Sequence, residues 1–86
     1  MWYIYIVKCQ DDSFYVGTSS DLTRRFQEHK DGRGGKYTSH HKPSKIIYSE
    51  SFDKKEEAFK REKQLKGWSR KKKENLVRYG KQITPA

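Results

Sequence analysis

The sequence predicts an α+β fold, with a small three-stranded antiparallel sheet flanked by helices in the order β-β-α-β-α-α. Three observations support this prediction. The chain has 86 residues, which is the length of one domain. Three short runs are rich in aromatic and β-branched residues, as strands are, and only a few polar residues separate the first two. The segments between and after them carry apolar residues three or four positions apart, which is typical of helices.

The first two strands are expected at residues 2–9 and 14–18, where they would form a β-hairpin. A three-residue loop at 11–13 would pair Gln10 with Phe14 and Cys9 with Tyr15, with Asp12 in the left-handed region. Side chains alternate along a strand, so this register assigns each residue to one of two faces. The first face holds Tyr5, Val7, Cys9, Tyr15 and Gly17, and the second holds Trp2, Ile4, Ile6, Phe14 and Val16.

The first helix is predicted over residues 22–30, directly after three polar residues that can cap it. Leu22 and Phe26 are spaced for one buried stripe. Arg25 and His29 are four residues apart and therefore share the neighbouring stripe. The glycine-rich stretch that follows ends this helix and predicts a flexible loop.

The second half predicts one more strand, at residues 45–52, and two more helices. Asp53 and Glu56 are spaced as a capping box for a helix that runs to about Lys66, with Gly67 as its C-terminal cap. Ser69 is expected to open the last helix, which ends near Tyr79 and Gly80. We expect one domain over residues 1–80 and a flexible tail over 81–86.

The charge of the chain indicates an anionic partner. Twenty Lys and Arg residues give a formal net charge of +9 and a pI of about 9.7, which favours nucleic acid first and an anionic membrane second. No apolar run is long enough to span a membrane, and no signal peptide is expected at the N-terminus. Cys9 is the single cysteine, so an internal disulfide is impossible, which fits a reducing cytosol.

Glu62 stands out in the second half of the chain. Ala58 lies four residues before it and Leu65 three after it, so the carboxylate is in line with a stripe that should face the core. A buried carboxylate needs a partner. One interpretation is an ion pair with a nearby lysine or arginine, and the other is a metal ligand facing the hairpin. A single carboxylate plus substrate phosphate suits Mg²⁺, which keeps several of its water ligands.

Arg25 and the hairpin tyrosines also allow two interpretations each. Arg25 is either a solvated helix arginine, as Arg24 beside it is expected to be, or a guanidinium that stabilises phosphate charge in a transition state. Tyr5 and Tyr15 are either ordinary strand aromatics or phenols that transfer a proton or position a water molecule. Gly17 would weaken a strand unless another group approaches it closely.

An ordered set of these residues resembles the GIY-YIG nuclease superfamily. The set comprises Tyr3-Ile4-Tyr5, Tyr15-Val16-Gly17, Arg25, His29 and Glu62, and the resemblance extends over nearly the whole chain, from residue 2 to about residue 79. No single triplet is specific, but the ordered set is. The glycine-rich stretch and the lysine-rich last helix resemble more particularly the small stand-alone bacterial branch, often described as uncharacterised or excinuclease-like.

The resemblance implies a role for five residues. The signature tyrosines fall on Tyr5 and Tyr15, which would activate or position the attacking water. The catalytic arginine falls on Arg25, the following histidine on His29, which would assist proton transfer or hold the network, and the metal-binding glutamate on Glu62. The implied activity is a DNA endonuclease that hydrolyses phosphodiester bonds with Mg²⁺ or Mn²⁺. The implied setting is the nucleoid of the cytoplasm, and the implied roles are the repair or recombination of structured or branched DNA.

Three features depart from the family pattern. Tyr3 replaces the glycine of the first signature, at a strand position where the active site should survive. Many relatives carry an asparagine late in the domain, and Asn75 does not match it securely. No attached DNA-binding domain is recognised, so the protein is expected to be weakly specific or to need a protein partner that confers specificity.

Several basic and aromatic residues outside this set are expected to contact nucleic acid, chiefly its phosphate backbone. They are Arg24, Arg33, Lys36, Tyr37, Lys42, Lys71 and Lys72. The glycine-rich stretch lacks the Gly-Lys-Ser/Thr order of a P-loop, and the histidines and Cys9 lack the spacing of a zinc finger. Two alternatives to an endonuclease remain: a nucleic-acid-binding module without turnover, and a basic protein associated with the ribosome or RNA.

Overall fold

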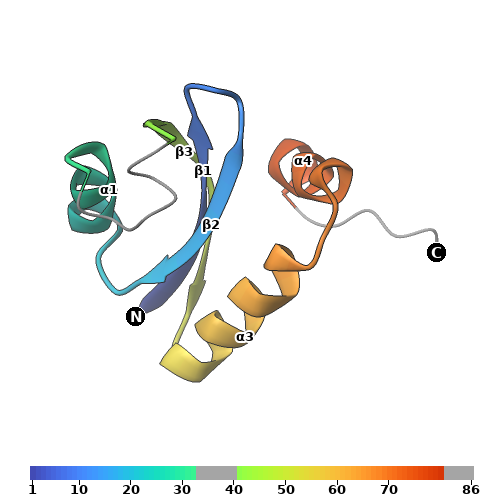
Figure 1. The fold of residues 1–86 in the computed structure, drawn as a ribbon. Coiled ribbons are helices and arrows are strands. Elements are labelled where there is room, and N and C mark those ends of the chain that lie inside the picture. Colours follow the sequence, from blue (N-terminus) through green and yellow to red (C-terminus); the bar gives the residue numbers. More distant parts are fainter. Residues whose placement is uncertain (33–40, 81–86) are drawn as a thin grey trace.

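The computed structural model describes residues 1–32 and 41–80, and it confirms the predicted α+β class and order of elements (Figure 1). The predicted roles of Arg33, Lys36 and Tyr37 and the predicted tail fall outside the described residues. The strands are β1 (Trp2–Cys9), β2 (Phe14–Ser19) and β3 (Pro43–Phe52). The described helices are α1 (Leu22–Lys30), α3 (Lys55–Lys66) and α4 (Arg70–Tyr79).

The three strands form one antiparallel sheet in the order β2-β1-β3, with helices on both of its faces. Figure 1 shows α1 on one side of the sheet and α3 and α4 on the other. Each face therefore has its own small core, as the alternation along β1 requires. One core joins the sheet to α3 and α4 through Ile4, Ile6, Val16, Ala58, Leu65 and Leu76. The other joins it to α1 through Tyr5, Val7, Cys9, Leu22 and Phe26.

The hairpin closes with a three-residue loop, as predicted, but the loop lies one residue earlier in the chain. It consists of Gln10, Asp11 and Asp12, and the N–H of Asp12 donates to the carbonyl of Cys9 at 2.9 Å. Asp12 has a φ of 72°, the left-handed conformation expected for it. The Asp11 carboxylate accepts hydrogen bonds from the backbone and the hydroxyl of Ser13, at 3.1 and 2.6 Å. These bonds hold Ser13 where the second strand is about to begin, outside the loop.

The register of the hairpin consequently differs from the predicted one by two residues. Tyr15 lies opposite Val7 instead of Cys9, and Phe14 lies opposite Lys8 instead of Gln10. A shift of two leaves every side chain on its predicted face, because the period of a strand is also two. The shared face of the two signature tyrosines is thus confirmed, although the residue pairs were wrong.

The ends of α1 and α4 lie where the sequence predicts them. The Asp21 side chain caps α1 by accepting from the N–H of Arg24 at 3.1 Å. Ser69 caps α4 in the same way, and Gly80 ends it in the left-handed conformation with a φ of 74°. The helix that carries Arg25 is therefore fixed at its first turn to the end of the hairpin.

The predicted start of α3 is wrong by one residue. Its N-cap is Lys54, whose side chain makes no capping hydrogen bond, so Asp53 and Glu56 do not form a capping box. Strand β3 ends at Phe52, as predicted, so the difference lies in the two bend residues between the strand and the helix. Strand β3 also begins earlier than predicted, at Pro43, which an edge strand tolerates.

Candidate active site

Tyr5 lies directly over Gly17, its partner on the neighbouring strand. A Cβ atom placed on Gly17 would lie 2.4 Å from the Tyr5 hydroxyl oxygen and 2.5 Å from Cζ, far inside van der Waals contact. The glycine is therefore required by the ring that crosses it, which is the close approach that a glycine within a strand indicates. The Tyr5 side chain, only 1% exposed, is thereby directed across β2 toward the edge of the sheet.

Three rings meet beside this crossing. The hydroxyl of Tyr5 lies 2.8 Å from Nε2 of His29, which is fully buried on α1. Tyr15 completes the group, with its ring centroid 5.1 Å from that of His29 and 6.4 Å from that of Tyr5. The hairpin and α1 thus bring together a phenol, an imidazole and a second phenol, all groups that transfer protons.

Arg25 adds a positive charge to the group. It is half-buried on α1, one helical turn before His29, and its guanidinium donates to the Glu28 carboxylate at 3.2 Å. Burial works against its charge, but hydrogen bonds to Tyr5 and Glu28 outweigh burial and raise the pKa of Arg25. Arg24, in contrast, is exposed, and its Nε atom makes only a long ion pair with Asp21, at 3.9 Å from the carboxylate. Arg24 is therefore solvated, as expected, whereas Arg25 faces the tyrosines.

The environment keeps Tyr5 and His29 electrically neutral at pH 7. Burial raises the pKa of Tyr5 to about 12, and the hydrogen bond from Arg25 only partly opposes this. Burial also lowers the pKa of His29, and the Arg25 charge acts in the same direction. A neutral imidazole beside a neutral phenol can accept the phenolic proton, so the pair can pass a proton onward.

Glu62 reaches this group from the other layer of the fold. It lies on α3, which packs against β1 and β2, and its side chain is 21% exposed. Its carboxylate is one of the charges that raise the pKa of Tyr5, so it lies within electrostatic range of the hydroxyl. It also pairs with Lys66 at 3.5 Å, the ion pair that one interpretation of the sequence expects. Because this pair is between side chains one turn apart and partly exposed, it holds the carboxylate only weakly.

Comparisons with known proteins show the family of this chain. The family model described as GIY-YIG catalytic domain matches residues 1–75 of the chain. The chain belongs to the GIY-YIG family. It is similar to the UPF0213 protein SSP2268 of Staphylococcus saprophyticus, with 47% identity over 91% of this chain and 95% of that protein. It is also similar to the UPF0213 protein YazA of Bacillus subtilis, with 46% identity over 87% and 76% of the two chains.

Two solved structures resemble the fold of this chain. The solution NMR structure of the UPF0213 protein BH0048 from Bacillus halodurans has 42% identity and a TM-score of 0.58, covering 91% of this chain and 84% of that one. The structure of the protein EF2693 from E. faecalis has 34% identity and a TM-score of 0.61, covering 98% and 92%. The GIY-YIG assignment therefore rests on the family model, and the two solved structures share the fold.

The departures from the GIY-YIG pattern lie outside the ring cluster. Tyr3 takes part in a regular ladder, opposite Ser19 on one side and Ser51 on the other, so it leaves β1 intact. Asn75 lies on α4 and lines a groove on the opposite face of the sheet, so it does not join Tyr5 and His29. Neither departure removes a group from the candidate site.

The residues predicted to contact nucleic acid are spread over the molecule. Arg24 is exposed on α1, and Lys42 is exposed where β3 approaches the hairpin loop, with its carbonyl accepting from the N–H of Gln10 at 2.8 Å. Lys71 and Lys72 lie on α4, on the face of the sheet away from α1. They are therefore not brought to the tyrosine cluster. No helix in the described ranges is long and apolar enough to cross a membrane.

The residues of the candidate site fit a metal ion that takes few protein ligands. Within residues 1–32 and 41–80, no cluster of three or more His, Cys, Asp and Glu side chains could enclose an ion. Glu62 offers a partly exposed carboxylate within electrostatic range of Tyr5, and the other nearby carboxylate, Glu28, is paired with Arg25. Mg²⁺ is commonly held by one or two carboxylates together with water and substrate phosphates, so this donor set suits Mg²⁺ or Mn²⁺ better than a fully enclosed ion.

A network that the sequence analysis missed holds α3 in place. Arg61, next to Glu62, donates from Nε and Nη2 to the two carboxylate oxygens of Glu50 on β3, at 2.9 and 3.1 Å. Tyr48 donates its hydroxyl to the same carboxylate, and Arg61 also donates to Gln64 at 2.8 Å. Nothing in the spacing of Glu50 and Arg61 indicates this pairing, because it depends on the packing of α3 against β3.

Replacing Arg61 with leucine is expected to destabilise the fold by about 1–3 kcal/mol, because the half-buried Glu50 loses charged hydrogen bonds. The double variant Arg61→Leu/Glu50→Leu should be more stable than Arg61→Leu, since it leaves no unpaired carboxylate. Urea denaturation measures both. Equal stability of Arg61→Leu and the unaltered protein would contradict the anchoring role.

The buried His29 predicts a loss of stability in mild acid. Its folded-state pKa is lowered below the usual value of about 6.5, so the unfolded chain binds more protons between the two values. The free energy of unfolding is therefore expected to fall as the pH drops through 6.5. Thermal unfolding between pH 5 and 8 measures this slope. His29→Gln, which cannot titrate, should have a shallower slope, and an unchanged slope would contradict this origin.

Proposed function

We propose that this GIY-YIG protein is a divalent-metal-dependent endonuclease that hydrolyses DNA phosphodiester bonds. The observation that carries the proposal is that Arg25 hydrogen-bonds to Tyr5, while Glu62, from a third element, lies within electrostatic range of the same hydroxyl. A core would need only their apolar parts, whereas a phenol, a guanidinium and a carboxylate together match the needs of phosphate hydrolysis. The net charge of +9 suits a polyanionic substrate.

Each group has a distinct part in the proposed reaction. A water molecule attacks phosphorus, the bond to the leaving oxygen breaks, and this oxygen takes up a proton from solvent, so the products are a phosphate monoester and a hydroxyl end. Arg25 stabilises the charge on the phosphate oxygens in the transition state. Glu62 would hold the Mg²⁺ or Mn²⁺ ion, which would supply charge stabilisation for the phosphate.

Tyr5 and His29 handle the proton of the attacking water. The pKa of about 12 means that Tyr5 is not a base until its own proton leaves. His29, kept neutral by burial, accepts that proton through Nε2 in the tautomer protonated at Nδ1, and Tyr5 then takes the proton from water. Tyr15, in contact with the His29 ring, positions the water.

We propose repair or recombination in the nucleoid of the cytoplasm as the setting, with structured or branched DNA as substrate. A protein partner would supply specificity that a domain of this size lacks. In this proposal a single domain, residues 1–80, carries all five site residues.

Incubation of the purified protein with flapped, branched, duplex and single-stranded DNA tests the proposal. Cleavage is expected with Mg²⁺ or Mn²⁺, and none in EDTA. Cleavage should be lost in Arg25→Ala and in Glu62→Ala. Binding without cleavage on every substrate would replace the endonuclease by a binding module, and a preference for structured RNA would indicate an RNA-associated protein. Equal cleavage by both variants would indicate a contaminating nuclease.

A further inference from the structure

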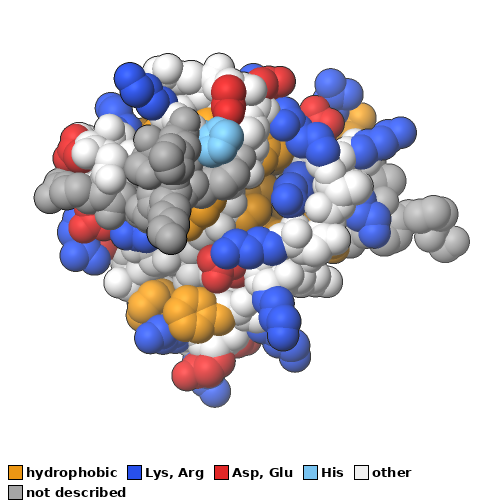
Figure 2. All heavy atoms as spheres, viewed as in Figure 1, with side chains coloured by type: hydrophobic (Ala, Val, Ile, Leu, Met, Phe, Trp, Pro, Cys, Tyr) orange, Lys and Arg blue, Asp and Glu red, His pale blue; other side chains and the backbone are white. Residues whose placement is uncertain are grey.

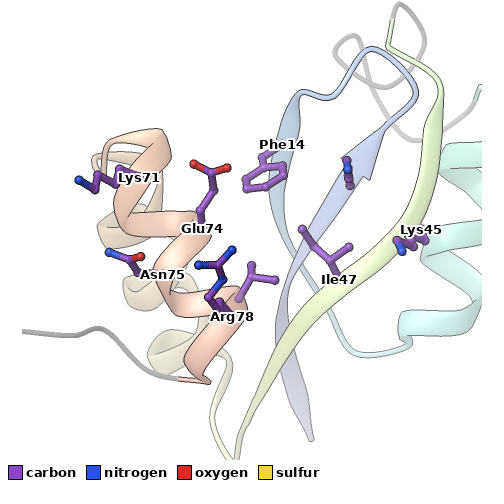
Figure 3. Close-up of a pocket in the computed structure, with 9 residues that line it drawn as sticks. Phe14, Lys45, Ile47, Lys71, Glu74, Asn75 and Arg78 are labelled. Carbon is purple, nitrogen blue, oxygen red and sulfur yellow. The ribbon is translucent and has the colours of Figure 1, made fainter.

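A groove of about 470 Å³ lies between α4 and the sheet, on the face opposite α1 and the tyrosine cluster (Figure 3). Its walls come from all three strands and from α4. The candidate active site does not use it, because Tyr5 and His29 belong to the other face. Figure 2 shows Lys and Arg side chains gathered over α4, beside hydrophobic side chains exposed between α4 and the sheet.

The groove is strongly cationic. Lys8, Lys45, Lys71 and Arg78 line it, and Glu74 is the one acidic residue among its lining residues. Lys8 is paired with Asp12 at 3.1 Å, outside the groove lining. Among the residues that the structure describes, no ion pair joins the other three cations to a carboxylate. Cations held together without counter-charges raise the local concentration of anions.

The floor of the groove is apolar. Phe14, Ile47 and Val77 line it, and all three are half-buried and packed against the core of that face. The Arg70 guanidinium stacks on the Phe14 ring, 3.7 Å from its centroid. Asp12 fixes Arg70 in this position by accepting from Nη1 through its carbonyl at 2.6 Å. Arg70 thus holds the Phe14 ring from outside the groove lining, and the fixed ring is an aromatic surface against which a nucleobase can pack.

A cationic rim around an apolar floor matches a ligand that is anionic on one side and flat and apolar on the other. An unpaired nucleotide has both properties. A B-form duplex presents its phosphates but keeps its bases stacked inside, so it would leave the apolar floor unused. An acidic peptide would satisfy the rim alone.

We propose that the groove between α4 and the sheet is a second nucleic-acid site that takes a single-stranded segment, with a base packed against the apolar floor at Phe14 and phosphates on Lys45, Lys71 and Arg78. The charge and apolar floor of the groove support a single-stranded nucleic acid as the ligand. The choice of DNA over RNA rests on the proposed function. A junction between duplex and single strand can then contact both faces of the sheet at once.

Titration of the ¹⁵N-labelled protein with the octanucleotide (dT)8 in EDTA, followed by NMR, locates the binding. Amide shifts are expected around Phe14, Ile47 and Val77, with smaller changes around Tyr5 and His29. A hairpin duplex of equal phosphate number should perturb the groove less. Shifts confined to the α1 face, or equal groove shifts with the duplex, would overturn the proposal.

Charge-matched variants test the rim. Lys45→Gln/Arg78→Gln should bind (dT)8 more weakly in fluorescence anisotropy. The slope of the logarithm of its binding constant against the logarithm of the salt concentration should decrease in magnitude by about 1.4, or about 0.7 for each phosphate contact on a single strand. The control Lys54→Gln/Lys63→Gln removes the same charge at exposed positions of α3 and the turn before it. If the groove variant proves unfolded by circular dichroism, Arg78→Gln alone replaces it, with a slope change of about 0.7.

Three results would overturn the single-strand site. They are equal weakening in both double variants, no weakening in either, and binding of poly-glutamate as tight as binding of (dT)8. The test is separate from that of the endonuclease, because it contains no metal. Groove binding without DNA cleavage in the metal-dependent assay would contradict the proposed endonuclease activity only. Cleavage without groove binding would contradict the second site only.

Discussion

The Glu62→Gln variant is expected to lose metal-dependent DNA cleavage by roughly 100- to 1,000-fold, the usual cost of removing one group that stabilises a transition-state charge. The amide has nearly the shape of the carboxylate, but it carries no charge to hold a divalent ion. Stability should change little, because the partly exposed pair with Lys66 contributes at most about 1 kcal/mol. Single-turnover cleavage in Mg²⁺ and thermal unfolding measure the two effects.

Glu56→Gln is the matched control for this variant. It makes the same chemical change at an exposed position of the same helix, and it should cleave like the unaltered protein. Binding of DNA by Glu62→Gln in EDTA should be unchanged or tighter, because a negative charge has been removed. Full cleavage by Glu62→Gln would contradict a role for this carboxylate in the reaction. Glu62 would then be only the partner of Lys66 in an ordinary helix ion pair.

The Gly17→Ala variant is expected to lose both stability and activity. Its Cβ would lie 2.4 Å from the Tyr5 hydroxyl oxygen, and the ring cannot yield easily because it is buried and bonded to His29. Overpacking of this kind costs about 1–3 kcal/mol. Any movement of Tyr5 also breaks its contact with His29, so cleavage should fall by more than the loss of folded protein explains. Urea denaturation and cleavage of the same samples measure the two losses.

A double-mutant cycle isolates the contact between these two residues. In a Tyr5→Ala background, the space that the ring occupied is vacant, so Gly17→Ala should cost much less than it does with Tyr5 present. A cost that is the same in both backgrounds would mean that Gly17 is needed for a reason other than the Tyr5 ring.

The hairpin illustrates what a strand pattern can predict. A three-residue loop, together with the alternation of side chains along a strand, assigned Tyr5, Tyr15 and Gly17 to one face, and the structure agrees. The position of that loop was not fixed by the pattern, because a register shift of two residues preserves both faces. That choice depends on the hydrogen bonds of Asp11 to Ser13, which compete with other loop conformations of similar sequence.

The candidate site, too, was predicted where local spacing decides a position and missed where tertiary packing decides it. Helical spacing was sufficient to place Arg25 beside His29 and to mark Glu62 as unusual. The approach of Glu62 to Tyr5 depends on how α3 packs against β1 and β2, which no local pattern encodes. The Glu50 and Arg61 pair that fixes α3 was missed for this reason.

The central claim is that α1 and α3, from opposite layers, supply Arg25 and Glu62 to one reaction. A kinetic cycle of Arg25→Ala, Glu62→Gln and the double variant, read as kcat/KM for metal-dependent cleavage of one DNA substrate, tests it most directly. Residues that act as a unit give strongly non-additive effects, so the double variant should be no slower than the slower single variant by more than about threefold. Losses that multiply in full, or a single variant with unchanged kcat/KM, would contradict a shared site.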